Sequence, residues 1–241
     1  MKTFFISDLH LDPSRPIINQ IFLDFLEHDA IHADALYILG DFFEAWIGDD
    51  DENELATQVI KGLRQLHDRG IPIYIMQGNR DFLLSERFCE ASGCILLKDP
   101  TAIKLYGKTV LLMHGDSLCT HDRTYMRIRP IIRARWFKWV LYRLSLAFRR
   151  RLAQKARAKS KRSNREKSPM IMDVNLEAVR AAMNEYHAEV LIHGHTHQPA
   201  IHYLSLQEPK LRIVLSDWYE SGHVFSYEES GEHKLIYIKK K

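Results

Sequence analysis

The sequence has few features of secreted or disulfide-stabilised proteins. Only three cysteines occur among 241 residues, and no two of them form a Cys-x-x-Cys pair. They are Cys89, Cys94 and Cys119. This number and spacing support neither a disulfide framework nor a thiolate zinc site, and they fit a reducing cytosol. The first apolar run, residues 3–6, soon meets Asp8 and His10, so we expect no signal peptide.

Long hydrophobic runs and a strong net charge are also missing. No stretch reaches the roughly 18 apolar residues of a membrane span, and the most apolar window, residues 139–148, contains Arg143. Lys and Arg total 34 against 31 Asp and Glu, but the charge is unevenly divided. Residues 123–167 hold 17 basic residues and one acidic residue, whereas the rest of the chain holds 17 basic and 30 acidic residues. The chain is therefore an acidic body with a basic insert.

Five short apolar runs share one pattern, and this pattern predicts an α/β fold. The runs cover residues 3–7, 35–39, 71–77, 109–113 and 189–193, and each ends in a cluster of Asp, His, Asn or Gly. Such runs read as buried strands, and layered α/β folds place their chemistry at the carboxyl ends of strands. We expect helices at residues 17–26, 55–66 and 175–186, further strands at 211–215 and 234–238, and a helical insertion at 122–168.

The polar clusters at the strand ends predict a metal centre. Carboxylate, amide and imidazole groups are ligands of Mn²⁺, Fe²⁺ or Zn²⁺, and burying so many without a metal would be costly. The spacing in Asp8-x-His10 and His195-x-His197 puts both side chains on one side of an extended segment. Seven ligands suit two ions, about 3.5–4 Å apart, with the Asp41 carboxylate able to bridge them. The ligands are Asp8, His10, Asp41, Asn79, His114, His195 and His197.

In order along the chain, these motifs resemble those of the calcineurin-like metallophosphoesterase superfamily. The motifs are Asp-x-His, Gly-Asp, Gly-Asn-Arg-Asp, His-Gly and Gly-His-x-His. The resemblance implies a four-layer α/β/β/α sandwich. It also implies that one ion is held by Asp8, His10, Asp41 and His197, and the other by Asp41, Asn79, His114 and His195.

Arg80 stands where many members of this superfamily have a histidine that protonates an alkoxide leaving group. A guanidinium does not usefully donate a proton, but it binds phosphate well. The residue therefore favours a phosphate leaving group, and hence cleavage of a pyrophosphate bond. The alternative is that Arg80 is only a structural ion-pair partner of Asp81.

The basic insert combines cations with bulky aromatic and leucine residues at 136–148. This mixture favours contact with anionic lipid over ordinary helix packing, and over nucleic-acid binding. At the end of the insert, four polar residues follow one another at spacings of 3, 4 and 3, which put them on one helix face of about 80°. Such a face suits a phosphate and a hydroxylated sugar. The alternative is that this face is simply solvated. These residues are Arg157, Ser160, Asn164 and Lys167.

Six blocks over essentially the whole chain are similar to the UDP-2,3-diacylglucosamine pyrophosphohydrolase family of lipid A biosynthesis. The blocks are residues 37–51, 78–83, 113–122, 158–168, 171–175 and 191–202. The resemblance implies that water attacks the α-phosphorus of UDP-2,3-diacylglucosamine, with two Mn²⁺ ions, giving UMP and 2,3-diacylglucosamine 1-phosphate. The substrate contacts that it implies are Asn79, Arg80, Asp122, Ser160, Asn164, Lys167 and His195.

The resemblance also implies a division of the chain and a set of partners. Residues 1–121 and 169–241 would form the metallophosphoesterase core, and residues 122–168 a helical lid over the acyl chains. We expect a lipid-linked UDP-sugar substrate and an anionic membrane surface, on the cytoplasmic face of the inner membrane. We expect no nucleic acid, and no protein partner is implied. The alternatives are another dinuclear-metal phosphodiesterase or nuclease, and a non-catalytic scaffold.

Overall fold

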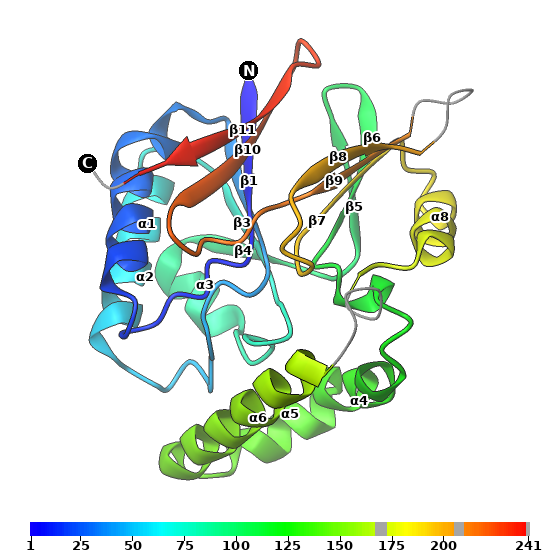
Figure 1. The fold of residues 1–241 in the computed structure, drawn as a ribbon. Coiled ribbons are helices and arrows are strands. Elements are labelled where there is room, and N and C mark those ends of the chain that lie inside the picture. The colour runs from blue at the N-terminus through cyan, green and yellow to red at the C-terminus, as the bar shows by residue number, and fades with distance from the viewer. Residues whose placement is uncertain (167–172, 205–209, 240–241) are drawn as a thin grey trace.

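The computed structural model describes residues 1–166, 173–204 and 210–239, and two β-sheets form its centre (Figure 1). The first sheet has the strand order β11-β10-β1-β2-β3-β4. Its strands are Lys2–Ile6 (β1), Ala35–Leu39 (β2), Ile73–Met76 (β3), Cys94–Leu97 (β4), Gly222–Glu228 (β10) and His233–Ile238 (β11). The second sheet has the order β5-β6-β7-β9-β8. Its strands are Thr101–Leu105 (β5), Lys108–Met113 (β6), Val190–His193 (β7), Ala200–Tyr203 (β8) and Leu211–Val214 (β9).

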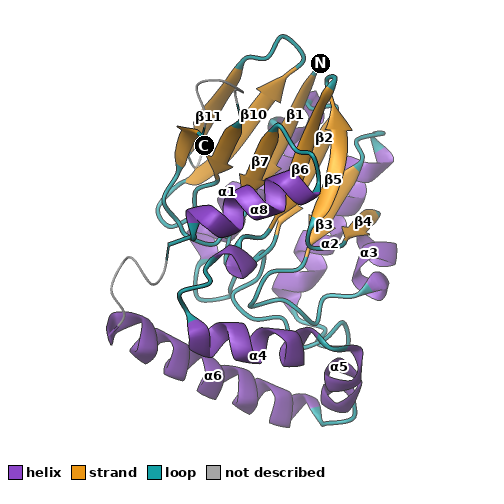
Figure 2. Ribbon diagram, turned by 90° about the vertical axis from the view of Figure 1, so that its right-hand side faces the viewer, coloured by secondary structure: helices purple, strands orange, loops and turns teal. Residues whose placement is uncertain are grey.

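Helices lie on the outer faces of both sheets, and three more lie at one end of the molecule (Figure 2). The outer helices are Pro16–His28 (α1), Glu54–Asp68 (α2) and Glu86–Ser92 (α3) on the first sheet, and Leu176–Glu185 (α8) on the second. The others are Arg123–Arg133 (α4), Arg135–Tyr142 (α5) and Leu146–Glu166 (α6). Short 3-10 turns occur at Ala30–His32 and Asp116–Leu118.

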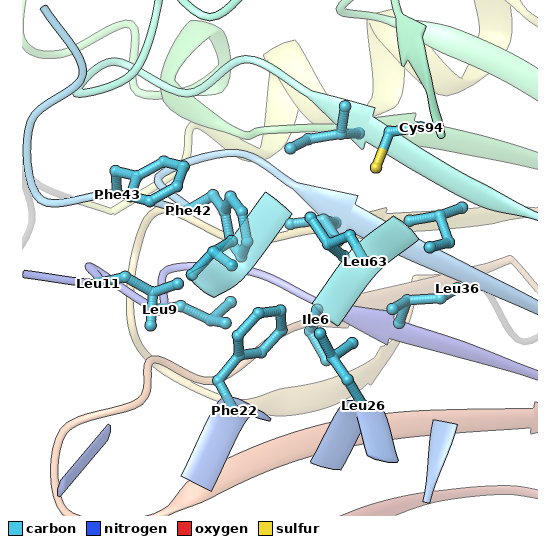
Figure 3. Packing of buried hydrophobic residues seen from close by; sticks show 14 of the residues in the cluster. Ile6, Leu9, Leu11, Phe22, Leu26, Leu36, Phe42, Phe43, Leu63 and Cys94 are labelled. Atoms are coloured by element: carbon cyan, nitrogen blue, oxygen red, sulfur yellow. The ribbon is translucent and has the colours of Figure 1, made fainter. Parts of the chain in front are cut away.

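Alternation of side chains along the central strands creates separate hydrophobic layers. In β1, Phe4 and Ile6 join the cluster beneath α1 and α2, whereas Phe5 joins the cluster between the two sheets. Leu111 of β6 packs in a third cluster, under α8. Figure 3 shows the first of these clusters. Because a strand points successive residues to opposite faces, three clusters separate four layers. The expected α/β/β/α sandwich is therefore confirmed.

The structure confirms the main predicted elements and adds others. The five runs with polar ends form β1, β2, β3, β6 and β7, and the predicted helices are α1, α2 and α8. The strands expected near residues 211–215 and 234–238 are β9 and β11, which lie in different sheets. Strand β10 was not predicted. It lies between β1 and β11 and is antiparallel to both. All three cysteines are buried, and none of them forms a disulfide among the described residues.

The part of the insert that the structure describes is helical, as predicted, and comprises α4, α5 and α6 (Figure 1). Ion pairs tie these helices to the acidic body. Arg129 Nε lies 2.9 Å from Asp116 Oδ2, and Arg129 Nη2 lies 2.8 Å from Asp99 Oδ2. Arg149 is buried and pairs with Asp50. Part of the basic charge therefore attaches the insert to the body instead of facing a lipid surface. Within the described ranges, no helix is both long and apolar enough to cross a membrane.

Trp218 is the largest fully buried side chain, and the packing of α1 depends on it. Its ring meets Phe22 and Phe25 edge to face, and its Nε1 donates to the His223 carbonyl over 2.9 Å. We expect Trp218→Ala to lower the free energy of unfolding by about 3–5 kcal/mol, since a large cavity remains. Urea unfolding followed by circular dichroism measures this. The neighbouring Tyr219 is exposed, so Tyr219→Ala is the matched control and should change stability by less than about 0.5 kcal/mol.

Candidate active site

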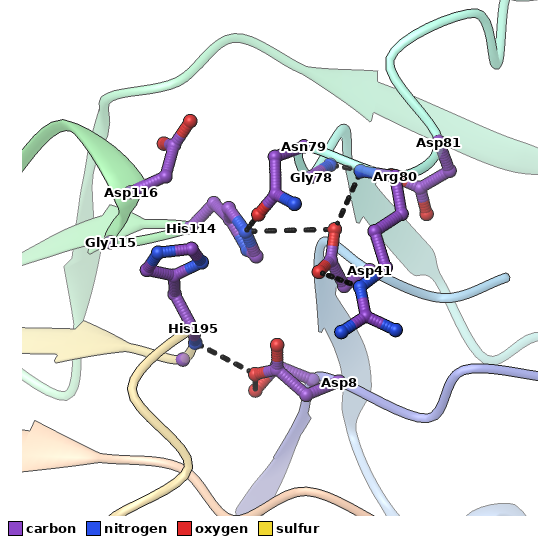
Figure 4. Close-up of polar contacts among 12 residues, drawn as sticks. Asp8, Asp41, Gly78, Asn79, Arg80, Asp81, His114, Gly115, Asp116 and His195 are labelled. Carbon is purple, nitrogen blue, oxygen red and sulfur yellow. Dashed lines mark hydrogen bonds and ion pairs between the residues drawn. The ribbon is translucent and has the colours of Figure 1, made fainter. Parts of the chain in front are cut away.

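The polar clusters meet because both sheets present the carboxyl ends of parallel strands to the same region (Figure 4). Asp8 and His10 follow β1, Asp41 follows β2 and Asn79 follows β3. His114 follows β6, and His195 and His197 follow β7. Backbone hydrogen bonds join the loops, from Asp8 N to Gly40 O at 3.1 Å and from Gly194 N to His114 O at 2.9 Å.

The backbone is strained at most of these positions. Five of the seven expected ligands have a positive φ, a backbone conformation that residues other than glycine rarely adopt. The angles are 54° at Asp8, 51° at His10, 48° at Asp41, 71° at His195 and 54° at His197. Each such residue costs about 1–3 kcal/mol and persists only where the surrounding structure enforces it. Concentration of this strain on the expected ligands marks the region as functional.

Two glycines allow the loops to pack closely around the site. A Cβ on Gly78 would lie 2.1 Å from Asp41 N, and a Cβ on Gly194 would lie 2.2 Å from Asp8 Oδ2. Asp41 N belongs to the backbone, and Asp8 Oδ2 is held by hydrogen bonds from Ser7 Oγ and His195 N, so neither atom can move away cheaply. Gly78 therefore permits close packing of the loops after β2 and β3 in the first sheet, and Gly194 permits close approach of the loops after β1 and β7, which belong to different sheets.

Asp8, His10 and His197 form the first group of potential metal ligands. His10 Nε2 and His197 Nε2 are 3.4 Å apart, and His197 Nε2 lies 3.3 Å from Asp8 Oδ1. Ser7 Oγ and His195 N donate to Asp8 Oδ2, but Asp8 Oδ1 is buried and accepts no hydrogen bond from any described residue. The unsatisfied carboxylate oxygen and the facing imidazole nitrogens point to one place, which suits a cation.

Asp41, His114 and His195 form the second group. His114 Nε2 lies 3.7 Å from Asp41 Oδ1 and 3.0 Å from Asn79 Oδ1, so Asn79 belongs to the same cluster. The His114 ring places its other nitrogen, Nδ1, 3.0 Å from the Leu39 carbonyl, which fixes its orientation. The two groups divide six of the expected ligands along the line that the superfamily pattern implied, and the assignment of each ligand to an ion stays a prediction. The bridging role of Asp41 stays a prediction.

The electrostatics of the donor set suit divalent ions. Burial lowers the pKa of both His10 and His195 to about 4, so each imidazole is neutral at physiological pH and keeps a lone pair for a metal. Burial disfavours the charged form of Asp41, yet the nearby His114, His10 and Arg80 keep its pKa below the ordinary value. Neutral imidazoles and ionised carboxylates are the states that bind transition ions, so His10, His195 and Asp41 are already in the binding state. Although burial opposes the charged form of His114, nearby carboxylates, Asp41 first, raise its pKa, so His114 would release a proton when an ion binds.

Asp217 was not predicted as part of the site, but it contacts an expected ligand. Its Oδ2 lies 3.2 Å from His197 Nδ1. Although burial opposes the charged imidazole, contacts with the carboxylates of Asp217 and Asp8 raise the pKa of His197 to about 10. A carboxylate behind a metal-binding histidine orients its ring. No motif spacing links Asp217 to His197, so nothing in the sequence pointed to this contact.

Two acidic residues next to the ligands have structural roles instead. Asp81 accepts hydrogen bonds from Gly78 N and Phe42 N, and does not pair with Arg80. Asp116 accepts from Tyr125 and Arg129 of α4. Arg80 itself contacts Asp41, with Nε 3.2 Å from Oδ2, and also Glu44. The structural alternative for Arg80, a pair with Asp81, is therefore not what the structure shows.

A cavity of about 1200 Å³ opens from the first ligand group toward α6. Its walls include Arg80, Arg157 and Ser160, which were predicted to contact substrate, together with His10 and His197. Asp122, another predicted contact, caps the N-terminus of α4 by accepting from Tyr125 N over 3.1 Å. Asn164 belongs to α6, but its side chain is outside the description, and Lys167 lies beyond the described residues. The substrate contacts stay predictions.

Comparison with known proteins gives one consistent group of relatives. The family model for calcineurin-like phosphoesterases matches residues 1–199. The chain is 49% identical to the UDP-2,3-diacylglucosamine hydrolase of Pseudomonas aeruginosa over 97% of this chain and 98% of that protein. It is 50% identical to the UDP-2,3-diacylglucosamine hydrolase of Pseudomonas entomophila over 94% and 95% of the two chains.

Solved structures show the same fold at low identity. An archaeal phosphodiesterase superposes with a TM-score of 0.51 and 12% identity, covering 99% of this chain and all of that one. A Vps29 variant from Entamoeba histolytica gives a TM-score of 0.51 and 14% identity, with full coverage of both chains. At such identities the likeness concerns the fold alone.

Metal binding provides a direct test of the two groups. We expect the wild-type chain to bind two Mn²⁺ ions, and His197→Ala to weaken one of them by at least about 10-fold, because one imidazole of the first group is lost. Equilibrium dialysis without any substrate measures both numbers. His202 is exposed and lies outside both groups, so His202→Ala is the control. Unchanged binding in His197→Ala would contradict the assignment.

Proposed function

Because the chain belongs to the calcineurin-like phosphoesterase family, and within it to the UDP-2,3-diacylglucosamine hydrolases, we propose that it hydrolyses the pyrophosphate bond of UDP-2,3-diacylglucosamine. The water oxygen attacks the α-phosphorus, and the bond between that phosphorus and the bridging oxygen breaks. The bridging oxygen leaves with the sugar phosphate. The products are UMP and 2,3-diacylglucosamine 1-phosphate, an intermediate of lipid A biosynthesis. The observation that carries this proposal is the joining of two metal-ligand groups and Arg80 in one site within a chain that matches these hydrolases over its whole length.

The proposed metals are two Mn²⁺ ions, with Asp41 shared between them. Such ions supply water activation and neutralise charge on the phosphoryl group. The chain contributes ligands that are already in place, since the strand ends and their strained loops hold them before substrate binds. This preorganisation avoids a reorganisation cost during the reaction.

Arg80 is proposed to bind the phosphate that leaves. Its Nε is held by Asp41 and one Nη by Glu44, so the guanidinium is fixed beside the ligand cluster (Figure 4). A fixed guanidinium binds phosphoryl oxygens without needing to give up a proton. The phosphate leaving group needs no acid catalyst, which agrees with an arginine at this position.

The insert is proposed to hold the sugar and acyl part of the substrate. Arg157 and Ser160 of α6 line the cavity, and the sequence spacing predicts that Asn164 and Lys167 share their helix face. His195, Asn79 and Asp122 would complete the contacts from the core side. In this arrangement the insert, proposed as residues 122–168, acts as a lid above a core of residues 1–121 and 169–241.

The outer side of the insert is proposed to rest on anionic lipid at the cytoplasmic face of the inner membrane. Trp136 and Trp139 are 61% and 58% exposed, and Ile131 and Phe148 are also exposed. Arg143 lies over the Trp139 ring at 4.6 Å. Exposed tryptophans beside cations are typical of surfaces that enter the headgroup region of a membrane. The substrate is itself a lipid, so this position would give the site direct access to it.

Release of UMP tests the proposed substrate. Detergent-solubilised UDP-2,3-diacylglucosamine with Mn²⁺ should give UMP, and chelation should stop the reaction. We expect Arg80→Ala to reduce this turnover by about 100-fold, because a fixed cation near the transition state is lost. Hydrolysis of bis(4-nitrophenyl) phosphate, whose leaving group is already good, should fall much less. Absence of UMP from the wild-type chain would reject the substrate, and steeply salt-dependent DNA cleavage would favour a nuclease.

Vesicle sedimentation tests the membrane surface. We expect the double variant Trp136→Ser/Trp139→Ser to bind vesicles of anionic phospholipid at least about 10-fold more weakly, because two interfacial anchors are lost. Turnover of bis(4-nitrophenyl) phosphate should stay unchanged. Tyr237 is 64% exposed on β11, away from the insert, and Tyr237→Ser is the matched control. Equal binding by the double variant and the wild type would contradict the proposed surface.

A further inference from the structure

Glu44 lines the cavity and lies beside three groups that the reaction would use. It follows Asp41 by three residues, and its backbone N donates to the Leu11 carbonyl over 3.0 Å, so its position is fixed by the loop after β1. Its side chain is 31% exposed. No motif in the sequence marks Glu44 as a site residue, although it lies within the block of residues 37–51 that is similar to the hydrolase family.

The Glu44 carboxylate joins two arginines from different parts of the chain. Oε2 accepts from Arg80 Nη1. Oε1 accepts from Arg157 Nε at 2.9 Å, and Arg157 Nη2 donates to the same oxygen. Two guanidinium groups that face one cavity repel each other, and a shared carboxylate offsets this repulsion. Each arginine uses only part of its donor set here, which leaves other N–H groups for a substrate phosphate.

The same carboxylate lies behind an expected metal ligand. Glu44 Oε2 is 3.7 Å from His10 Nδ1, whereas His10 Nε2 faces His197 in the first ligand group. His10 Nδ1 is buried and has no hydrogen-bond partner among the described residues. Glu44 is therefore placed to act on this ring through its charge, at a separation longer than a hydrogen bond and longer than the 3.2 Å between Asp217 and His197.

We propose that Glu44 is a positioning residue that couples α6 to the metal centre. It pairs with Arg157 of α6 and with Arg80 of the core, and it lies against the His10 ring. Attachment of α6 to the core and orientation of a metal ligand then depend on the same carboxylate. The inference rests on the proposed function for the roles of Arg80 and Arg157, but the contact with His10 stands without it.

Direct Mn²⁺ binding tests the contact with His10. Electron paramagnetic resonance of free Mn²⁺, with no substrate present, should show that Glu44→Gln binds one of two Mn²⁺ ions about 10- to 100-fold more weakly, as loss of an outer carboxylate does elsewhere. Glu44→Asp, which keeps the charge, should recover part of this affinity. Unchanged Mn²⁺ affinity in a folded Glu44→Gln protein would overturn the proposal. If Glu44→Gln fails to fold, Mn²⁺ binding by Glu44→Asp decides: a weaker site supports the proposal, and wild-type affinity contradicts it.

A double-mutant cycle tests the coupling to α6. Glu44→Gln, Arg157→Gln and the double variant are compared by kcat/KM for UMP release. We expect the double variant to be no worse than the poorer single variant, because the two changes break one arrangement. Losses that multiply would show independent action and would contradict the coupling.

The matched control is another ion pair between the body and α6. Asp51 pairs with Arg150 of α6 and contacts no expected metal ligand, so Asp51→Asn should leave Mn²⁺ affinity unchanged.

Failure of the proposed substrate and failure of the proposed role of Glu44 give different results. If the wild-type chain releases no UMP, the substrate assignment fails, while Mn²⁺ binding and hydrolysis of bis(4-nitrophenyl) phosphate still decide the role of Glu44.

Discussion

Burial of ionised carboxylates at the meeting point of two sheets is the constraint on which the rest of this molecule depends. Asp8 and Asp41 are almost completely buried, and an isolated buried carboxylate is very costly. The fold surrounds them with imidazoles, backbone N–H groups and Arg80, so that both remain ionised. The loops adopt left-handed backbone conformations to bring these groups together, and this causes local strain. The need to keep these carboxylates ionised therefore accounts both for the strained loops and for the side chains that surround the site.

The same electrostatic logic explains the uneven charge of the chain. The acidic body and the basic insert attract each other, and the ion pairs of Arg129, Arg149 and Arg157 show where. These contacts are partly buried, so they are less screened by salt than surface pairs. They hold α4 near Asp116, two residues from His114, and α6 near Glu44, three residues from Asp41. The insert is thus attached beside the ligands themselves.

Much of the fold, and the residues that gather in the two candidate ligand groups, could be predicted, because both leave local traces in the sequence. A buried strand is a short apolar run, and a polar cluster at its end is visible without any knowledge of the fold. The edge strands β4 and β8 are short, β4 is half-exposed and β8 is mostly exposed, so neither shows a clear alternation of buried and exposed residues. The outer carboxylates Glu44 and Asp217 were missed for another reason. Their partners are His10 and His197, which are distant in sequence, and only tertiary structure relates them.

Asp116 and Glu44 show why a sequence motif alone does not settle which acid binds metal. Both follow a ligand closely, and both are carboxylates near the site. Asp116 faces Arg129 and Tyr125, so its oxygens already have partners on α4. Glu44 faces Arg80 and Arg157, with His10 at the edge of contact. In each case the carboxylate forms ion pairs with arginines of the insert or the core. Among the expected acidic ligands, Asp8 keeps a buried oxygen that accepts no hydrogen bond from a described donor, whereas both oxygens of Asp41 already contact Arg80. An unsatisfied oxygen therefore marks Asp8 as a candidate ligand, but Asp41 is marked only by its place beside His114 and His195.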